Sequence, residues 1–153
     1  MKPADQGLFY SLAIDDIGAL TVYLEARNQG MDGMLAVAFV IMNRANLWNK
    51  PIVNVCYDAN QFSCYLSNNK QYTLAVETAK TWPIDTDKAL QEAMAAFTCA
   101  LNKTIESPVG KATFYKVEGT KNDWFDKQIA IGKFIKKCQI GKHIFYEEKR
   151  FLK

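Results

Sequence analysis

The chain has 153 residues, of which 49% are hydrophobic and 23% are charged, and its formal net charge is +3. This length suits one domain, and the composition excludes a disordered or fibrous protein. Because the chain has neither a domain-wide positive balance nor a known motif for binding nucleic acid, we expect no nucleic acid among its partners. We expect one domain over residues 1–153, with one sizeable apolar core.

A first helix is predicted over residues 17–28. Asp15 or Asp16 is a suitable N-cap, and Gly30 stands where a left-handed C-cap would end the helix. The helix is therefore expected to stop just before this glycine.

A second helix is predicted over residues 33–46, with Asp32 as its cap. Its run "MLAVAFVIM" is almost entirely apolar, which indicates burial on most sides. Nine apolar residues are far fewer than the roughly 20 that span a bilayer, so we expect a core helix and no membrane span.

The middle of the chain gives weaker signals. Residues 47–72 contain several Asn and Asp and a proline, which is typical of a loop, although "IVNVCY" could form a short strand. A short helix is possible over residues 72–80. A clearer helix is predicted over residues 87–103, where apolar residues recur at helical spacing.

The last third of the chain contains the extended segments. "ESPVG" ends the preceding helix, "KATFYKV" is predicted to be extended, and a short helix near residues 125–137 leads into "IGKHIFYEE". The sequence therefore predicts a mainly α fold of the α+β class with a small β element.

One carboxyl group in the first predicted helix is isolated. Between residues 17 and 26 the only acidic side chain is Glu25, and it shares a helix face with small or apolar neighbours, namely Gly18, Thr21 and Val22. Burial of this group would raise its pKa, which suits a general acid that must stay protonated near neutral pH. The alternative is a structural ion pair with Arg27 or Arg44.

A series of short motifs runs from residue 23 to residue 146. In chain order they read "YLEAR", "GMLAVAFVIMNR", "QFS", "ATFY", an isolated Trp124 and "IGKHIFY". Over about residues 16–146, their order and spacing resemble the cell wall hydrolase family that is typified by the SleB-type spore-cortex-lytic enzymes and related phage endolysins. We interpret the chain as a phage-endolysin-like member.

The resemblance implies a lysozyme-like helical fold and a single catalytic domain over residues 1–153, which cuts peptidoglycan between N-acetylmuramic acid and N-acetylglucosamine without metal or cofactor. It also implies that Glu25 is the catalytic acid. A glycosidic oxygen leaves readily once it is protonated, and a neutral glutamate can supply the proton. If the same group then takes a proton from the sugar's 6-hydroxyl, one acid suffices and a 1,6-anhydro end forms. This is the lytic transglycosylase route.

The chain departs from the family pattern in three places. The common E-A-R-G-E is "EARNQ" here, so Gln29 replaces a second acid; Phe114 replaces a histidine; and Cys64 follows Q-F-S in place of an aromatic residue. The first change favours the single-acid route. A hydrolysing muramidase remains an alternative and would need a second carboxylate roughly 5–9.5 Å away. Asp32 and Asp58 are the candidates for it.

Several residues in these motifs are predicted to contact the substrate. Gln61 and Ser63 could hydrogen-bond sugar groups or fix their loop, while Phe62 packs beneath them. Three aromatic side chains could stack on sugar faces or belong to the core, namely Tyr115, Trp124 and Tyr146. His143 could hydrogen-bond near the cleft or be structural. We expect Arg27 and Arg44 to be architectural.

Other functions stay open. An N-acetylmuramoyl amidase would usually need metal ligands and more than one histidine, yet the chain has only His143. A cysteine nucleophile would have to pair Cys64 with His143. A non-catalytic wall-binding or structural protein that keeps the fold is a further alternative.

The N-terminal residues lack a long apolar stretch and a small-x-small cleavage site, so we expect no signal peptide. We expect a monomer that stays in the cytoplasm until it is released to the cell wall or periplasm, as in phage lysis, with its four cysteines reduced. Residues 133–153 carry 7 basic and 2 acidic side chains, so this basic tail could favour an anionic partner or form a solvated surface.

Overall fold

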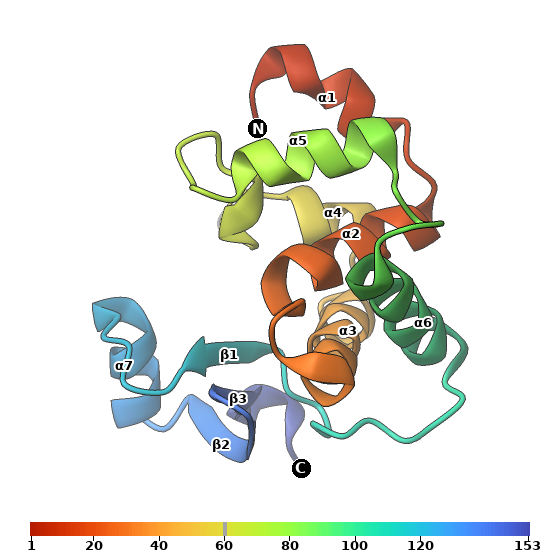
Figure 1. Cartoon of the computed structure of the whole chain (residues 1–153). Coiled ribbons are helices and arrows are strands. Elements are labelled where there is room, and N and C mark those ends of the chain that lie inside the picture. The colour runs from red at the N-terminus through yellow and green to blue at the C-terminus, as the bar shows by residue number, and fades with distance from the viewer. Residues whose placement is uncertain (60) are drawn as a thin grey trace.

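The computed structural model describes residues 1–59 and 61–153 of the chain. Its larger part is helical (Figure 1). The helices of this part, here called the helical body, are α1 (Pro3–Tyr10), α2 (Ile14–Ala26), α3 (Gly30–Leu47), α4 (Ile52–Tyr57), α5 (Tyr72–Thr81) and α6 (Lys88–Asn102), with a short 3-10 turn over Ser63–Tyr65. No single described helix has both the length and the hydropathy to cross a bilayer, although α1 and α2 together pass that test as a pair bent by 118°.

The main core lies where α2, α3 and α6 pack against one another. Leu20, Val37 and Phe97 are fully buried there. Gly18 on α2 lies directly against the ring of Phe97 on α6, and a Cβ at this position would overlap that ring. The absence of a side chain at Gly18 therefore allows the two helices to approach closely.

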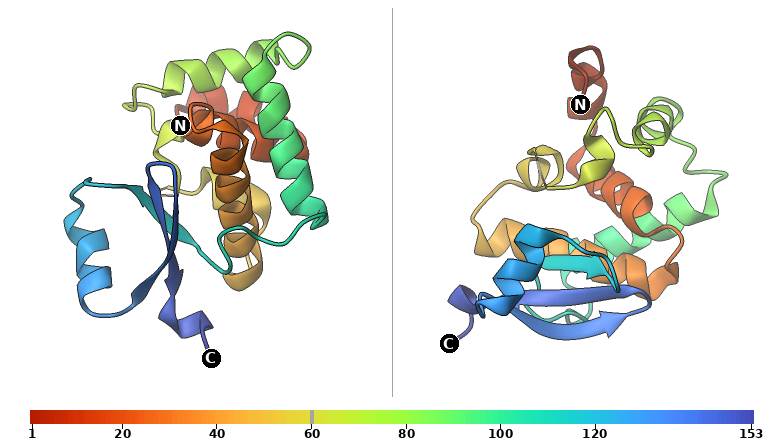
Figure 2. Two further views of the ribbon diagram at one scale, coloured as in Figure 1. Left: turned by 60° about the horizontal axis from the view of Figure 1, so that its bottom comes forward. Right: turned by 90° about the vertical axis from the view of Figure 1, so that its left-hand side faces the viewer.

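A three-stranded antiparallel sheet forms beside the helical body (Figure 2). The strands are β1 (Phe114–Val117), β2 (Phe134–Ile140) and β3 (His143–Glu148), in the order β1-β3-β2. Helix α7 (Asp123–Ala130) connects β1 to β2, and a 3-10 turn over Lys149–Phe151 follows β3. We call the strands, α7 and this last turn the sheet region. It has a small core of its own, made by Phe125, Phe134 and Tyr146.

Most of the predicted elements are confirmed. The helices predicted over 17–28, 33–46, 72–80 and 87–103 match α2, α3, α5 and α6, and the extended segments match the sheet. The predicted class, mainly α with a small β element, is therefore correct.

Several local predictions were wrong. Helix α1 was not expected, and "IVNVCY" forms helix α4 instead of a strand within the predicted loop. Position 60 of that loop lies outside the described residues. The helix predicted near 125–137 ends at Ala130, because the chain turns at Gly132, whose φ is +77°, and β2 begins at Phe134.

The predicted caps are displaced by a few residues. Ala13 is the N-cap of α2, so Asp15 and Asp16 lie in its first turn, where their charges favour the positive end of the helix dipole. Gln29 is the N-cap of α3, and Asp32 lies in the first turn of that helix. Gly30 has φ +73° but opens α3 instead of closing α2.

Candidate active site

A cleft of about 830 Å³ lies between the helical body and the sheet region. Six residues that the sequence singled out line it, namely Glu25, Gln61, Phe62, Ser63, Tyr115 and Trp124. They come from α2, the 61–63 segment, β1 and α7, so residues up to about 100 positions apart meet there.

Glu25 lies in the last turn of α2, one residue before the helix ends at Ala26. Its side chain faces the cleft, where the Tyr115 hydroxyl donates a hydrogen bond of 2.5 Å to Oε1. Burial raises the pKa of Glu25 above its ordinary value, while Tyr115, the positive charge of Arg44 and the Cys64 thiol partly oppose that rise. The site thus favours a protonated carboxyl group more than water does.

Tyr115 is a hydrogen-bond partner of Glu25, while its predicted stacking on a sugar face stays a prediction. Burial and the neighbouring Glu25 carboxyl raise the pKa of the Tyr115 phenol well above its ordinary value, so the phenol keeps its proton and remains a donor. Its ring is held by the edge of His143, with centroids 5.0 Å apart, and by Phe145 at 5.5 Å. The sheet therefore fixes the orientation of the Glu25 carboxyl group.

Arg44 lies beneath the cleft and is only 4% exposed. Its Nε donates to the Thr113 carbonyl at 2.6 Å, and its guanidinium lies 4.9 Å from the ring centroid of Phe62. Trp48 and Phe114 contact it in the same way, at 5.1 and 5.2 Å. Arg44 therefore joins α3 to the 61–63 segment and to the start of the sheet.

The structure does not contain the alternative for Glu25, an ion pair with Arg27 or Arg44, among the described residues. Arg27 instead donates to the Gln71 side chain at 2.6 Å and to the Leu24 carbonyl at 3.1 Å. Both arginines thus bind neutral oxygens, and within the described part of the chain no cation lies within salt-bridge distance of the Glu25 carboxyl.

The 61–63 segment forms one wall of the cleft. Phe62 is 4% exposed and packs on Arg44, as predicted for a residue beneath the surface. Ser63 is exposed, and at Gln61 it is the backbone carbonyl that Arg44 Nη1 approaches, at 3.5 Å. The side chains of Gln61 and Ser63 remain candidates for contact with a substrate.

The other predicted aromatic and histidine residues fall into two groups. Trp124 is 56% exposed on the cleft wall, so its indole is open to a ligand. His143 and Tyr146 are buried, each 6% exposed, and do not line the cleft. His143 packs on Tyr115, with Nδ1 unpartnered among the described residues, and Tyr146 packs on Phe125. In this structure His143 and Tyr146 therefore pack against other side chains beside the cleft and are not part of its lining.

Sequence reasoning missed about half of the cleft lining. The further residues are Arg44, Trp48, Leu66, Phe114, Asn122 and Phe125. Phe114 replaces the family's histidine, which was a usable signal. Arg44 ends the motif "GMLAVAFVIMNR" but was expected to be architectural, and the remaining four precede or follow motifs without belonging to one.

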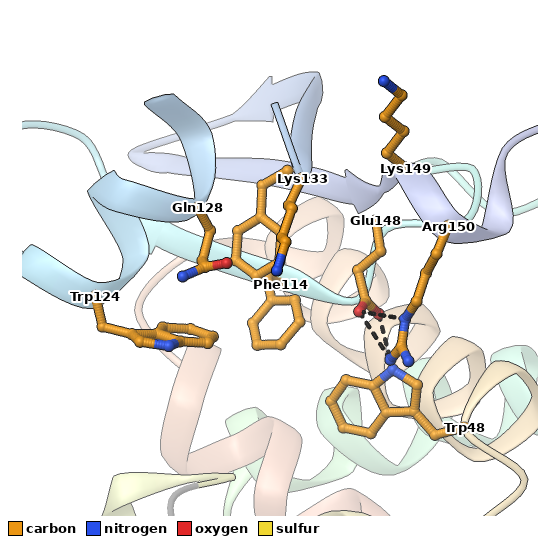
Figure 3. A pocket seen from close by; sticks show the side chains of 9 residues that line it. Trp48, Phe114, Trp124, Gln128, Lys133, Glu148, Lys149 and Arg150 are labelled. Atoms are coloured by element: carbon orange, nitrogen blue, oxygen red, sulfur yellow. Dashed lines mark hydrogen bonds and ion pairs between the residues drawn. The ribbon is translucent and has the colours of Figure 1, made fainter. Parts of the chain in front are cut away.

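Neither candidate for a second acid reaches the cleft. Asp32 is exposed at the start of α3, and Asp58 pairs with Lys50 at 3.7 Å. Among the described residues that line the cleft, Glu25 is the only carboxylic acid. Glu148 lies in a neighbouring hollow, where it accepts a hydrogen bond from Trp48 at 2.8 Å (Figure 3). It also accepts one from Thr113 at 2.7 Å.

The cysteines do not form a nucleophilic site. All four are unpaired, and Cys64 is 1% exposed. Burial raises the pKa of the Cys64 thiol far above its ordinary value, and the nearby Glu25 adds to that effect. A thiol in this state is a poor nucleophile because the thiolate is the reactive form. Within residues 1–59 and 61–153, no three His, Cys, Asp or Glu side chains cluster in a way that could hold a metal ion.

Comparison with known proteins gives matches to one family. The family described as Cell Wall Hydrolase matches residues 28–146, a stretch that begins three residues after Glu25. The catalytic domain of the germination-specific lytic transglycosylase SleB from Bacillus anthracis is 27% identical, with a TM-score of 0.61 over 88% of this chain and 93% of that one. The catalytic domain of SleB from Bacillus cereus is 25% identical, with a TM-score of 0.58 over 88% and 91%. No curated protein sequence matches the chain. The structural matches confirm the predicted lysozyme-like fold.

Proposed function

Since the chain belongs to the cell wall hydrolase family, we propose that it cuts peptidoglycan between N-acetylmuramic acid and N-acetylglucosamine as a lytic transglycosylase, with Glu25 as its only acid–base group. Family membership and the likeness to the SleB catalytic domains make it an enzyme that cleaves cell wall glycan. What we propose beyond this is the bond that is cut, the role of Glu25 and the 1,6-anhydro product.

In the first step Glu25 acts as the general acid. Its Oε1 accepts the hydrogen bond from Tyr115, so the proton is placed on Oε2. That proton passes to the glycosidic oxygen, and the bond between this oxygen and C1 of the muramic acid breaks with both electrons on the oxygen. N-acetylglucosamine leaves with a free hydroxyl, while positive charge develops at C1.

In the second step Glu25, now a carboxylate, acts as the base. The 6-hydroxyl oxygen of the same muramic acid bonds to C1 as its proton passes to Glu25. The product is a 1,6-anhydro ring, and the acid returns to its protonated form without the use of water. The hydrogen bond from Tyr115 stabilises the carboxylate between the two steps.

The observation that carries the proposal is the isolation of Glu25. A scheme with two carboxylates needs a second acid across the cleft, and the described lining offers none. A scheme with one acid needs a group that is protonated at first and is then a usable base. Burial raises the pKa of Glu25 and so favours the protonated acid, while the hydrogen bond from Tyr115 lowers that pKa and so favours the carboxylate.

The test is clearing of peptidoglycan embedded in a gel. We expect Glu25→Gln to lose activity by at least about 100-fold, because the amide can neither give nor take the proton. Glu92→Gln, on the far helix α6, should clear like wild type. Equal clearing by wild type and Glu25→Gln would remove Glu25 as the acid, and no clearing by any of the three would favour a non-catalytic wall-binding protein.

We also propose that the protein acts as a single-domain monomer of the endolysin type, which reaches the wall only after a membrane pore opens. The resemblance of its motifs to phage endolysins supports this role. Expression in bacterial cells with and without a pore-forming partner tests it. Lysis that depends on the pore is expected, whereas lysis without the pore would contradict the proposed route of release.

A further inference from the structure

A second hollow, of about 420 Å³, adjoins the cleft (Figure 3). It lies between α7, the start of β2 and the end of β3. The two spaces share Trp48, Phe114 and Trp124 as lining residues, so these rings form the boundary between them. A ligand that occupies the cleft can therefore extend a branch across the rings into the hollow.

The floor of the hollow is aromatic. Phe114 and Phe134 stack with centroids 4.4 Å apart, and Trp124 lies 5.9 Å from Phe114. Gln128 projects from α7 beside them (Figure 3). Such a floor suits small apolar groups and peptide planes, with one amide side chain to hydrogen-bond them.

The charges around this floor are mostly positive. Glu148 is the one carboxylate in the described lining, and Arg150 pairs with it at 2.9 Å. Lys133 has no carboxylate partner within salt-bridge distance among the described residues. In Figure 3 its ammonium points toward the mouth of the hollow near Phe114 and Gln128, whereas Lys149 points away. Among the described lining residues, Lys133 is thus the cation without a carboxylate partner that faces the hollow.

Lys133 is held in place by the backbone. Its carbonyl accepts a hydrogen bond of 2.9 Å from the Lys149 amide, which closes the open end of the β2–β3 hairpin. The neighbouring Phe134 is buried in the small core. The cation therefore stands on a fixed part of the sheet region, close to the cleft.

We propose that this hollow binds the carboxylate-bearing peptide branch of the muramic acid that occupies the cleft, with Lys133 as the group that binds the carboxylate. The inference rests on the proposed function. The sugars of a peptidoglycan strand are neutral once the lactyl group of muramic acid is joined to its peptide, so the negative charge of the strand lies on that peptide. Alanine methyl groups of such a branch suit the aromatic floor.

The test compares two forms of one substrate, namely glycan strands that carry their peptides and strands from which the peptides have been stripped and the freed lactyl carboxylates converted to neutral amides. Lys133→Gln should lower kcat/KM on peptide-bearing strands by roughly twofold to fivefold, the size expected for one exposed charge contact. It should leave stripped strands unaffected. The loss should shrink at high salt because the contact is open to solvent.

Lys142→Gln is the matched control. Lys142 lies in the turn at the other end of the same hairpin, so the variant makes the same change of net charge away from the hollow. It should behave like wild type on both substrates. Equal losses of kcat/KM in the two variants would show that the effect comes from the change in net charge alone, and this would overturn the proposal. No loss in Lys133→Gln on peptide-bearing strands, or an equal loss on stripped strands, would also overturn it.

A failure of the proposed function gives a different result. In that case wild type cleaves neither form of the strand, or Glu25→Gln cleaves both. Binding then still tests the hollow, because Trp48 and Trp124 line it. Peptide-bearing fragments should change the tryptophan fluorescence of Glu25→Gln at lower concentrations than stripped fragments do. Equal affinity for the two would contradict the proposal.

Discussion

The helical body and the sheet region differ in how they are built and in what they bring to the cleft. The body has a large continuous core, and Glu25 lies half-buried in the last turn of its helix α2. The sheet region has a small second core, exposes Trp124, Ile131 and Ile135, and holds the basic end of the chain. In the proposed mechanism, the body therefore fixes the position of the acid, while the sheet region orients it through Tyr115 and offers residues for contact with the substrate.

The largest expected effect lies in the body. Gly18→Val places a side chain where the ring of Phe97 already lies, so the helices α2 and α6 must separate. We expect a loss of about 3 kcal/mol or more in the free energy of unfolding, measured by urea denaturation.

Gly7→Val on α1 is the matched control for that substitution. A Cβ there meets no atom within 4 Å, so the change should cost less than about 1 kcal/mol. Equal losses at Gly7 and Gly18 would show that the close approach of the two helices is not what makes the body rigid.

A smaller effect is expected where the two regions meet. Tyr115→Phe removes the hydrogen bond to Glu25 and should reduce kcat by about tenfold, since the carboxyl group is less well oriented. That hydrogen bond lowers the pKa of Glu25, so its loss raises the pKa further. Activity that needs the protonated acid falls as the pH rises through this pKa, so the alkaline limb of the pH–rate profile should move to higher pH.

A second variant, His143→Phe, separates the effect of the Tyr115 hydroxyl from the effect of packing around the Tyr115 ring. His143→Phe should also disturb the ring of Tyr115, which His143 contacts at 5.0 Å, but it leaves the hydroxyl in place. The alkaline limb should therefore stay near its wild-type position in His143→Phe. An unchanged limb in Tyr115→Phe would contradict the role of the hydroxyl.

The smallest expected effect lies on the exposed wall. Trp124→Ala removes a ring that is 56% exposed in the cleft and should raise KM by roughly threefold to tenfold with kcat nearly unchanged. Ile131→Ala, at a site 54% exposed just after α7, is the control and should leave KM as it is. A fall in kcat without a change in KM would place Trp124 with the reacting group instead of with the ligand.

Sequence reasoning predicted the helical body well because its helices are long and periodic. The apolar run of α3 and the spacing in α6 are local patterns that burial requires. Helix α4 was missed because six residues are too few to show a helical period, and its β-branched residues favour a strand. The start of strand β2 was predicted as the end of a helix. Its pairing with β3 is irregular, because the register shifts between Lys136 and Cys138.

The candidate site could be predicted only in part. Glu25 stands out locally because it is the only acid between residues 17 and 26, a stretch that is otherwise mostly apolar. Its hydrogen bond to Tyr115 joins residues 90 positions apart, and no local pattern encodes that contact. The hollow beside the cleft is likewise assembled from Trp48, Phe114 and Lys133, which come together only through the tertiary fold.

The most direct test of the single-acid route is mass spectrometry of the ends released from purified peptidoglycan. If Glu25 both gives and takes the proton, every new muramic acid end carries the 1,6-anhydro ring, which borohydride leaves unchanged. New ends that borohydride reduces would show that water attacked C1, and they would contradict the proposal that Glu25 works without a second acid.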